Sequence, residues 1–431
     1  MTHQRKSICY LLLVFLFFQL CRHNNGLQAQ SIFRGVSFPP VDNMEETYIN
    51  FPTGEREIYD DFFKKLDRLI FEGEGNLSIL HIGASHIQAG TLSHQIRINL
   101  LSTFPGLVGD RGLIFPFSAA KTNNPHNYKT TSTGTWEISR NTQKEPKFPL
   151  GLSGMGLATS DVQATIGITL RNMDDVVFDF NTIYVLGACD SGYVRVMVQI
   201  QDSIIVEGIY DSTRLAYCFR LDFYTNSFKL FFEKKDSLWE TFYLRGFWLE
   251  NGLPGISYVD VGVNGASVSS YLKCKYLEND LAFVKPDLCI FSIGINDASG
   301  TNFDTTYFQR NYKELIRRIR TVSPNCAILF TTNNDSFHKV GKRYYNNPNG
   351  LLAKQAFYSL AKYYNAGVWD LFSVMGGLNS MKKWEERGLA LRDKIHFTPE
   401  GYSLIGNFVY NAFIFEYINH LKNTFNIHGL E

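Results

Sequence analysis

The sequence has no excess of either charge, no low-complexity segment and no internal repeat of fixed period. Its 431 residues include 42 Lys and Arg against 41 Asp and Glu, which gives a formal net charge of +1. That balance argues against the basic surfaces that bind nucleic acid or anionic membranes. We therefore expect no nucleic-acid partner. Because 45% of the residues are hydrophobic, the chain can bury a large core and form more than one domain.

Long hydrophobic runs are also scarce, and the one at the N-terminus is short. Arg5 and Lys6 precede an apolar run over residues 8–21, and a membrane span needs about 20 apolar residues. A charged start followed by a short apolar run is typical of a secretory signal. We predict a signal peptide over residues 1–29, cleaved after Ala29, and no stable membrane span in the mature chain. An uncleaved anchor is the alternative; a lipoprotein site at Cys21 lacks the small residues that usually precede it.

Cysteines are few, and their spacing does not indicate a disulfide framework. An odd number remains after residue 29, at the widely separated positions Cys189, Cys218, Cys274, Cys289 and Cys326. Cys289 lies in an apolar run and is expected to be a small buried hydrophobic residue. Pairing of Cys189 with Cys218 stays open for an exported chain.

Hydrophobic spacing divides the remainder into two kinds of segment. Strands and helices alternate on either side of a central block, which predicts a parallel sheet with helices on both faces. The expected helices cover 56–71, 91–103, 268–281, 304–322, 351–365 and 399–422, and the expected strands cover 77–82, 256–263, 288–293, 327–332 and 368–374. Residues 160–249 instead read as many short β-runs, which is typical of a β-sandwich. The fold class is therefore α/β, with an inserted β-sandwich.

Polar and small residues follow several strands of the predicted parallel sheet. Ser85 follows the first strand in HIGASHIQAG, Gly265 the second in GVNGAS, and Asn296 the third in GIND, while Asp393 and His396 follow the last strand in DKIH. Carboxyl ends of parallel strands form the active sites of open α/β sheets. Serine hydrolysis needs a nucleophile, a base, an orienting carboxylate and donors for the oxyanion. We expect Ser85, His396 and Asp393 to form the triad, with Ser85, Gly265 and Asn296 forming the oxyanion hole.

The order GxSH, NGAS, GxND and DxxH resembles the SGNH (GDSL-like) hydrolases, whose four blocks supply Ser, Gly, Asn and His. The resemblance covers residues 76–105 and 255–425, and it implies the same roles for Ser85, Gly265, Asn296 and His396, with Asp393 completing the triad. It also implies a three-layer α/β fold that needs no metal or organic cofactor. The family usually has Asp before the nucleophile, where this chain has Ala84. That Asp is not the triad carboxylate, so Ala84 removes no catalytic atom. Two interpretations stay open, a slower or altered enzyme and an inactive relative of the family.

A long separation between the first two blocks refines the resemblance. An SGNH domain interrupted by a β-sandwich resembles the exported peptidoglycan O-acetylesterases, whose sandwich resembles a carbohydrate-binding module. The implied domains are residues 50–115 and 255–425 for the hydrolase and 116–254 for the insertion. The implied substrate is an O-acetyl ester on a polysaccharide, in the periplasm or outside the cell. An O-acyltransferase with the same triad and a catalytically weak glycan-binding protein are the alternatives; the oligomeric state is left open.

Several other residues have simpler explanations than catalysis. His81, His86 and His94 do not share a helix or strand face, so we expect no metal site; His81 is expected in the core and His86 in a turn or in support of the nucleophile. Asp297 is expected to cap a turn. The loop 121–128 is expected at the surface, with the substrate cleft as the alternative. Three aromatic residues of the insertion, Trp239, Tyr243 and Trp248, are expected in its core rather than in a sugar-binding surface. The charged run 382–387 is expected on a solvated helix face.

Overall fold

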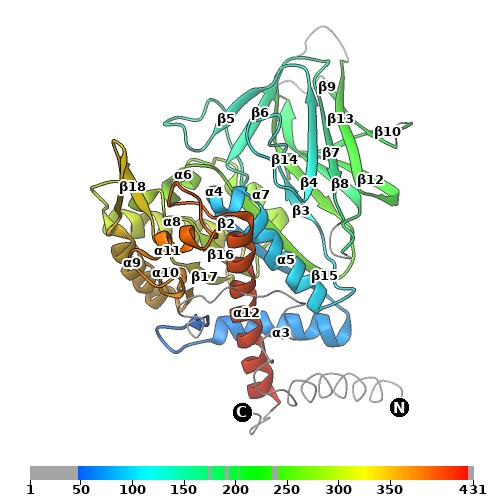
Figure 1. Ribbon diagram of the computed structural model, residues 1–431. Helices are drawn as coiled ribbons and strands as arrows, with labels where there is room; N and C mark the ends of the chain where they lie inside the picture. Colours follow the sequence, from blue (N-terminus) through cyan, green and yellow to red (C-terminus); the bar gives the residue numbers. More distant parts are fainter. Residues whose placement is uncertain (1–46, 173–175, 190–193, 202, 235–240, 426–431) are drawn as a thin grey trace, which may run out of the picture.

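Two lobes make up the molecule in the computed structural model (Figure 1). The structure describes residues 47–172, 176–189, 194–201, 203–234 and 241–425. The predicted signal peptide, residues 1–29, and Trp239 lie outside them. The lower lobe in Figure 1 holds a parallel sheet with helices, and the upper lobe consists of antiparallel strands. The predicted fold class, an α/β sheet interrupted by a β-sandwich, is therefore confirmed.

A six-stranded sheet forms the centre of the lower lobe, in the order β1-β20-β17-β16-β2-β15. Only β1 runs antiparallel, at the edge beside β20. The strands are β1 (Ile49–Asn50), β2 (Asn76–Gly83), β15 (Gly255–Gly262), β16 (Leu288–Ser292), β17 (Ala327–Thr331) and β20 (Gly367–Trp369). Chain order reverses at β2, because β15 lies on one side of it and β16 on the other. Ligand sites of open α/β sheets form outside the carboxyl ends of strands at such a point.

Helices cover both faces of this sheet. On one face α3, α5 and α12 pack together against the sheet, and on the other α6, α7, α8 and α9 pack side by side (Figure 1). The first group is α3 (Glu57–Glu72), α5 (Thr91–Thr103) and α12 (Pro399–Thr424); the second is α6 (Val268–Leu272), α7 (Leu277–Val284), α8 (Thr305–Val322) and α9 (Asn349–Tyr364). Shorter helices are α4 (Ser85–Gln88), α10 (Leu371–Val374), α11 (Ser380–Glu386) and a 3₁₀ turn, η2 (Asp297–Ser299). The burial of β2 and β16 follows from this coverage, and strands covered on both faces are largely apolar.

The upper lobe consists of two antiparallel sheets, in the orders β10-β9-β13-β7-β4 and β11-β12-β8-β14-β6-β5, with β3 also paired to β14. Rings of the two sheets meet between them, as in the pair Phe228 and Phe247, whose centroids lie 5.1 Å apart. The strands are β3 (Gly112–Ile114), β4 (Tyr128–Thr133), β5 (Glu137–Arg140), β6 (Met155–Thr159), β7 (Thr165–Leu170), β8 (Phe180–Cys189), β9 (Val194–Ile200), β10 (Ile204–Glu207), β11 (Ile209–Asp211), β12 (Ala216–Thr225), β13 (Ser227–Lys234) and β14 (Phe242–Glu250).

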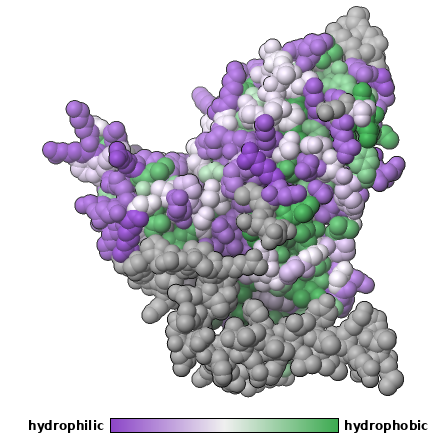
Figure 2. All heavy atoms as spheres, turned by 45° about the vertical axis from the view of Figure 1, so that its right-hand side comes forward, coloured by the Kyte–Doolittle hydropathy of each residue, from purple (hydrophilic) through white to green (hydrophobic). Residues whose placement is uncertain are grey.

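The insertion places its large aromatic residues mainly inside. Trp248 is buried and Tyr243 packs on Phe148, as expected for core residues. Exposed apolar side chains occur instead on the edge strands β10 and β11, among them Ile205 and Ile209, and Figure 2 shows hydrophobic residues on this lobe.

The domain boundaries at 115 and 254 stay predictions.

Two predicted elements are wrong. The helix expected over 268–281 is broken into α6 and α7, because the backbone N–H of Tyr276 leaves the helical pattern and donates to Leu150 C=O at 2.9 Å. The strand expected over 368–374 ends at Trp369 and is followed by α10. The side chain of Asp370 caps the N-terminus of α10. A hairpin of β18 (Phe337–Val340) and β19 (Arg343–Asn346) was not expected.

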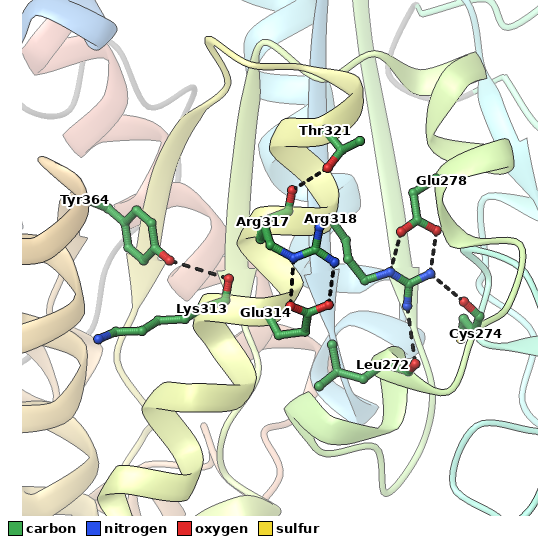
Figure 3. Close-up of polar contacts among 9 residues, drawn as sticks. All are labelled: Leu272, Cys274, Glu278, Lys313, Glu314, Arg317, Arg318, Thr321 and Tyr364. Atoms are coloured by element: carbon green, nitrogen blue, oxygen red, sulfur yellow. Dashed lines mark hydrogen bonds and ion pairs between the residues drawn. The ribbon is translucent and has the colours of Figure 1, made fainter.

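Arg318 of α8 links that helix to the broken segment (Figure 3). Its guanidinium pairs with both carboxylate oxygens of Glu278 at 2.5 Å. It also donates to the carbonyls of Leu272 and Cys274, at 3.2 and 2.9 Å. Carbonyls at a helix C-terminus lack partners within the helix, so Arg318 holds the end of α6. This matters for the site because the Gly265 turn leads directly into α6.

The described cysteines form no disulfide, so the open pairing of Cys189 with Cys218 is absent from this structure. Cys289 is buried, as expected. Across the ranges that the structure describes, no helix is long and apolar enough to cross a bilayer.

Candidate active site

Ser85 lies where β2 ends and the short helix α4 begins. Small residues allow this helix to sit directly on the strand ends: a Cβ on Gly83 would overlap the side chain of Ile87, and one on Gly262 would come within 2.6 Å of the Ala84 carbonyl. Gly83 pairs in register with Gly262 of β15 and with Ser292 of β16. The segments that carry Ser85, Gly265 and Asn296 therefore leave three neighbouring strands at the same level.

A continuous chain of hydrogen bonds links Ser85, His396 and Asp393. Ser85 Oγ lies 2.8 Å from His396 Nε2, and His396 Nδ1 lies 2.8 Å from Asp393 Oδ2. Because the carboxylate accepts from Nδ1–H, Nε2 is left as the acceptor for the serine hydroxyl. Burial raises the pKa of Asp393, but hydrogen bonds from the His396 N–H and ring and from the Ile395 N–H outweigh it. The net pKa lies below that of an ordinary aspartate, so the carboxylate is ionised at neutral pH.

The Asp393–His396 pair meets in a turn rather than in a helix. Residues 391–396 have no helical assignment, and Lys394 has a φ of 59°. Asp393 Oδ1 accepts the backbone N–H groups of Ile395 and His396 at 2.9 and 3.0 Å, which brings its second oxygen to the imidazole. Lys394 is ion-paired with Glu385 of α11, and its carbonyl accepts from the Phe337 N–H of the hairpin at 3.1 Å. Most of the run 382–387 is exposed, as expected, but Trp384 is buried and Glu385 pairs with Lys394 of this loop.

Gly265 and Asn296 lie next to each other on the loops after β15 and β16. The Ala266 N–H donates to Val263 C=O at 2.9 Å and closes a turn in which Gly265 has a φ of +80°. The positive φ is the reason for glycine at this position. Lack of space is not the reason, because an added Cβ would meet no atom within 4 Å. Asn296 Nδ2 donates to Ala266 C=O at 2.9 Å. That bond uses one amide hydrogen of Asn296 and leaves a second that can be directed to a substrate oxygen.

Asp297 connects the two loops through its carboxylate. Its oxygens accept the Val268 N–H at 3.1 and 3.3 Å, so it ties the start of α6 to the Asn296 segment rather than only capping its own turn. Burial raises the pKa of Asp297 to about 7. This group therefore titrates near neutral pH beside the proposed oxyanion hole.

The three histidines near Ser85 have separate environments. His81 is fully buried and hydrogen-bonds Tyr258 and Ser292, both at 2.6 Å, so it is a core residue, as expected. His86 hydrogen-bonds Tyr402 at 2.8 Å, and its ring lies 5.4 Å from that of His396. Burial, with the neighbouring His396, lowers the pKa of His86 to about 3 and keeps its ring neutral. His94 instead packs against His126.

No group of three or more His, Cys, Asp or Glu side chains within the described ranges is arranged to hold a metal ion.

Gln88 and the loop 121–124 belong to the surroundings of the site, and no pattern in the sequence indicated a role for Gln88. Part of the loop is exposed, as expected, and part of it contacts the surroundings of the site: Thr122 and Asn123 hydrogen-bond Gln88 at the end of α4, and Asn123 also bonds Asn264 beside Gly265. The glutamine lies in HIGASHIQAG, but its role depends on a residue 35 positions away and could not be read from spacing.

Comparison with known proteins finds a family that matches part of the chain. Residues 239–404 match the GDSL-like Lipase/Acylhydrolase family. This match confirms the resemblance drawn from the four motifs. It also supports the conclusion that the protein is a hydrolase or esterase. The match contains Gly265, Asn296, Asp393 and His396; Ser85 lies before it, because the insertion separates the first block from the other three.

A solved structure of a peptidoglycan O-acetylesterase resembles the chain over both lobes. It is 20% identical, covers 83% of this chain and 96% of its own, and has a TM-score of 0.67. At this identity the likeness shows the fold. An acetyl xylan esterase is 21% identical, covering 36% of this chain and 79% of its own with a TM-score of 0.29. A GDSL-like lipase from Bacteroides thetaiotaomicron is 16% identical, covering 37% and 76%, also at 0.29. No curated protein matches the sequence.

Proposed function

We propose that the protein is an exported serine esterase that removes O-acetyl or other short acyl groups from a polysaccharide. The observation that carries the proposal is the hydrogen-bond chain from Ser85 through His396 to Asp393, with both links at 2.8 Å. Ser85 and His396 are only partly buried, so an ester on a large polymer can reach them. The match to the GDSL-like Lipase/Acylhydrolase family supports this reaction class.

In the proposed mechanism, Ser85 Oγ attacks the ester carbonyl while His396 Nε2 takes its proton. Asp393 orients the imidazole and stabilises its charged form. The N–H groups of Ser85 and Gly265 and the amide of Asn296 donate to the oxyanion. His396 then protonates the leaving sugar oxygen, and a water activated by the same imidazole hydrolyses the acyl-enzyme and releases acetate.

Ala84 bears on the choice between an enzyme and a glycan-binding relative. The family usually has a carboxylate here, yet with a buried alanine at 84 the bonds among Ser85, His396 and Asp393 are formed. Loss of that carboxylate thus removes no hydrogen bond of the triad, which favours an enzyme. The likeness to a peptidoglycan O-acetylesterase across both lobes supports an acetylated glycan as substrate.

Acetate release from O-acetylated peptidoglycan and from acetylated xylan, by the native protein and by Ser85→Ala, tests this proposal. We expect release by the native protein only, and the better polymer names the substrate. Transfer of acetyl to an added glycan without net acetate release would instead indicate the O-acyltransferase. Glycan binding that survives in Ser85→Ala, with no release by the native protein, would indicate the binding protein.

A further inference from the structure

Gln88 is a buried glutamine whose amide connects three separate segments beside the active site. Its side chain is almost fully buried, although it lies at the end of the four-residue helix that begins with Ser85. Glutamine is mostly exposed in proteins, and a buried amide is costly unless both its donors and its acceptor have partners. Here they do.

The acceptor side of Gln88 holds the oxyanion turn. Gln88 Oε1 accepts the backbone N–H of Asn264 at 2.7 Å. Asn264 and Gly265 are the two central residues of the turn that the Ala266 N–H closes on Val263. The bond therefore fixes the peptide unit immediately before the one whose N–H belongs to Gly265. The backbone of Gln88 is itself fixed, since its N–H donates to Ala84 C=O at 2.9 Å.

The donor side of Gln88 is held by the loop 121–124. Gln88 Nε2 donates to Thr122 Oγ1 at 3.0 Å and to Asn123 Oδ1 at 2.9 Å. Asn123 Oδ1 also accepts from Asn264 Nδ2 at 2.8 Å. Gln88, Asn123 and Asn264 thus close a ring of hydrogen bonds, which allows the Gln88 amide only one orientation: oxygen toward Asn264, nitrogen toward the loop.

We infer that Gln88 is a positioning residue for the oxyanion hole, and that the loop 121–124 fixes the orientation of its amide. This inference rests on the proposed function. Oxyanion donors act only if they are already in place when the tetrahedral intermediate forms, and a misplacement of about 1 Å can cost about a hundredfold in rate. The loop lies within the predicted insertion, 116–254, so the insertion would contribute to catalysis as well as to any binding of glycan.

Gln88→Met tests the role, since methionine has a similar length but no hydrogen-bonding amide. We expect kcat for 4-nitrophenyl acetate to fall about 10- to 100-fold, with KM changed less than about threefold. Affinity for phenylboronic acid, which forms a tetrahedral adduct with a nucleophilic serine, should weaken in parallel with kcat. A residue that only stabilised the fold would lower the melting temperature without this split.

One further variant makes the test specific. Gln95→Met is the matched control, because Gln95 on α5 bonds Asn99 and not the turn. It should match the native protein.

The outcomes separate this inference from the proposed function. A native protein without esterase activity refutes both. An active native protein whose Gln88→Met variant folds and keeps full kcat refutes the role of Gln88 alone. If Gln88→Met does not fold, Gln88→Asn replaces it, because the shorter side chain withdraws the acceptor from Asn264 but keeps the amide; native kcat in that variant also refutes the role.

Discussion

Asp297→Asn should gain stability relative to the native protein as pH rises through the slightly acidic range. The ordinary pKa of this carboxyl is 3.8, and burial raises it to about 7 in the folded state. Between these values the folded state keeps a proton that the unfolded chain releases. The free energy of unfolding therefore falls as pH rises, by about 1.4 kcal/mol per pH unit for this group. Over the whole window the loss is about 4 kcal/mol; above pH 7 both states are ionised and the loss is constant.

The amide in Asp297→Asn carries no such charge, while its side-chain oxygen can still accept the Val268 N–H. Urea unfolding of native protein and Asp297→Asn at several pH values from about 4 to 8 measures the difference. We expect the variant to gain stability relative to native by a few kcal/mol up to about pH 7, and then no more. Asp304→Asn is the control, because Asp304 also accepts backbone N–H groups, at the start of α8, but is exposed. A difference between native and Asp297→Asn that does not change with pH would refute the reasoning.

Three other substitutions test the site. Asn296→Ala should lower kcat on the order of a hundredfold or more while the melting temperature stays near native, since it removes one oxyanion donor; native kcat would contradict that role. Asp393→Asn should lower kcat on the order of 10⁴-fold, because the amide does not hold the imidazole in the required tautomer; a small loss, seen in the same acetate assay, would show that another group orients His396. Gly265→Ala should cost about 1 kcal/mol or more of stability because its φ is positive, measured by thermal unfolding; no loss together with native kcat would show that this turn conformation is not required.

The parallel sheet and its strand ends could be predicted because several signals agree. Buried strands such as β2 and β16 are mostly apolar, and small or polar residues follow each one. Asp304 at the start of α8 and Thr398 with Pro399 at the start of α12 are ordinary capping residues. The helix at 91–103 was predicted with the observed bounds. Such local signals do not depend on the rest of the fold.

The features that the sequence did not reveal depend on long-range contacts. The break between α6 and α7 follows from the bond of the Tyr276 backbone to Leu150, which no local spacing encodes. The separation of Asp393 and His396 suits a helix, yet the segment is a turn because Asp393 accepts two nearby N–H groups. Gln88 resembles any polar residue of a short helix until the loop 121–124 folds against it.

The central claim is that Ser85 is a nucleophile activated by His396. Reaction with a fluorophosphonate, followed by intact-mass measurement and peptide mapping, tests it most directly. We predict one adduct on the native protein, located at Ser85, with none on Ser85→Ala and a strongly slowed reaction in His396→Ala. A folded native protein that forms no adduct, or forms one at another residue, would contradict the account.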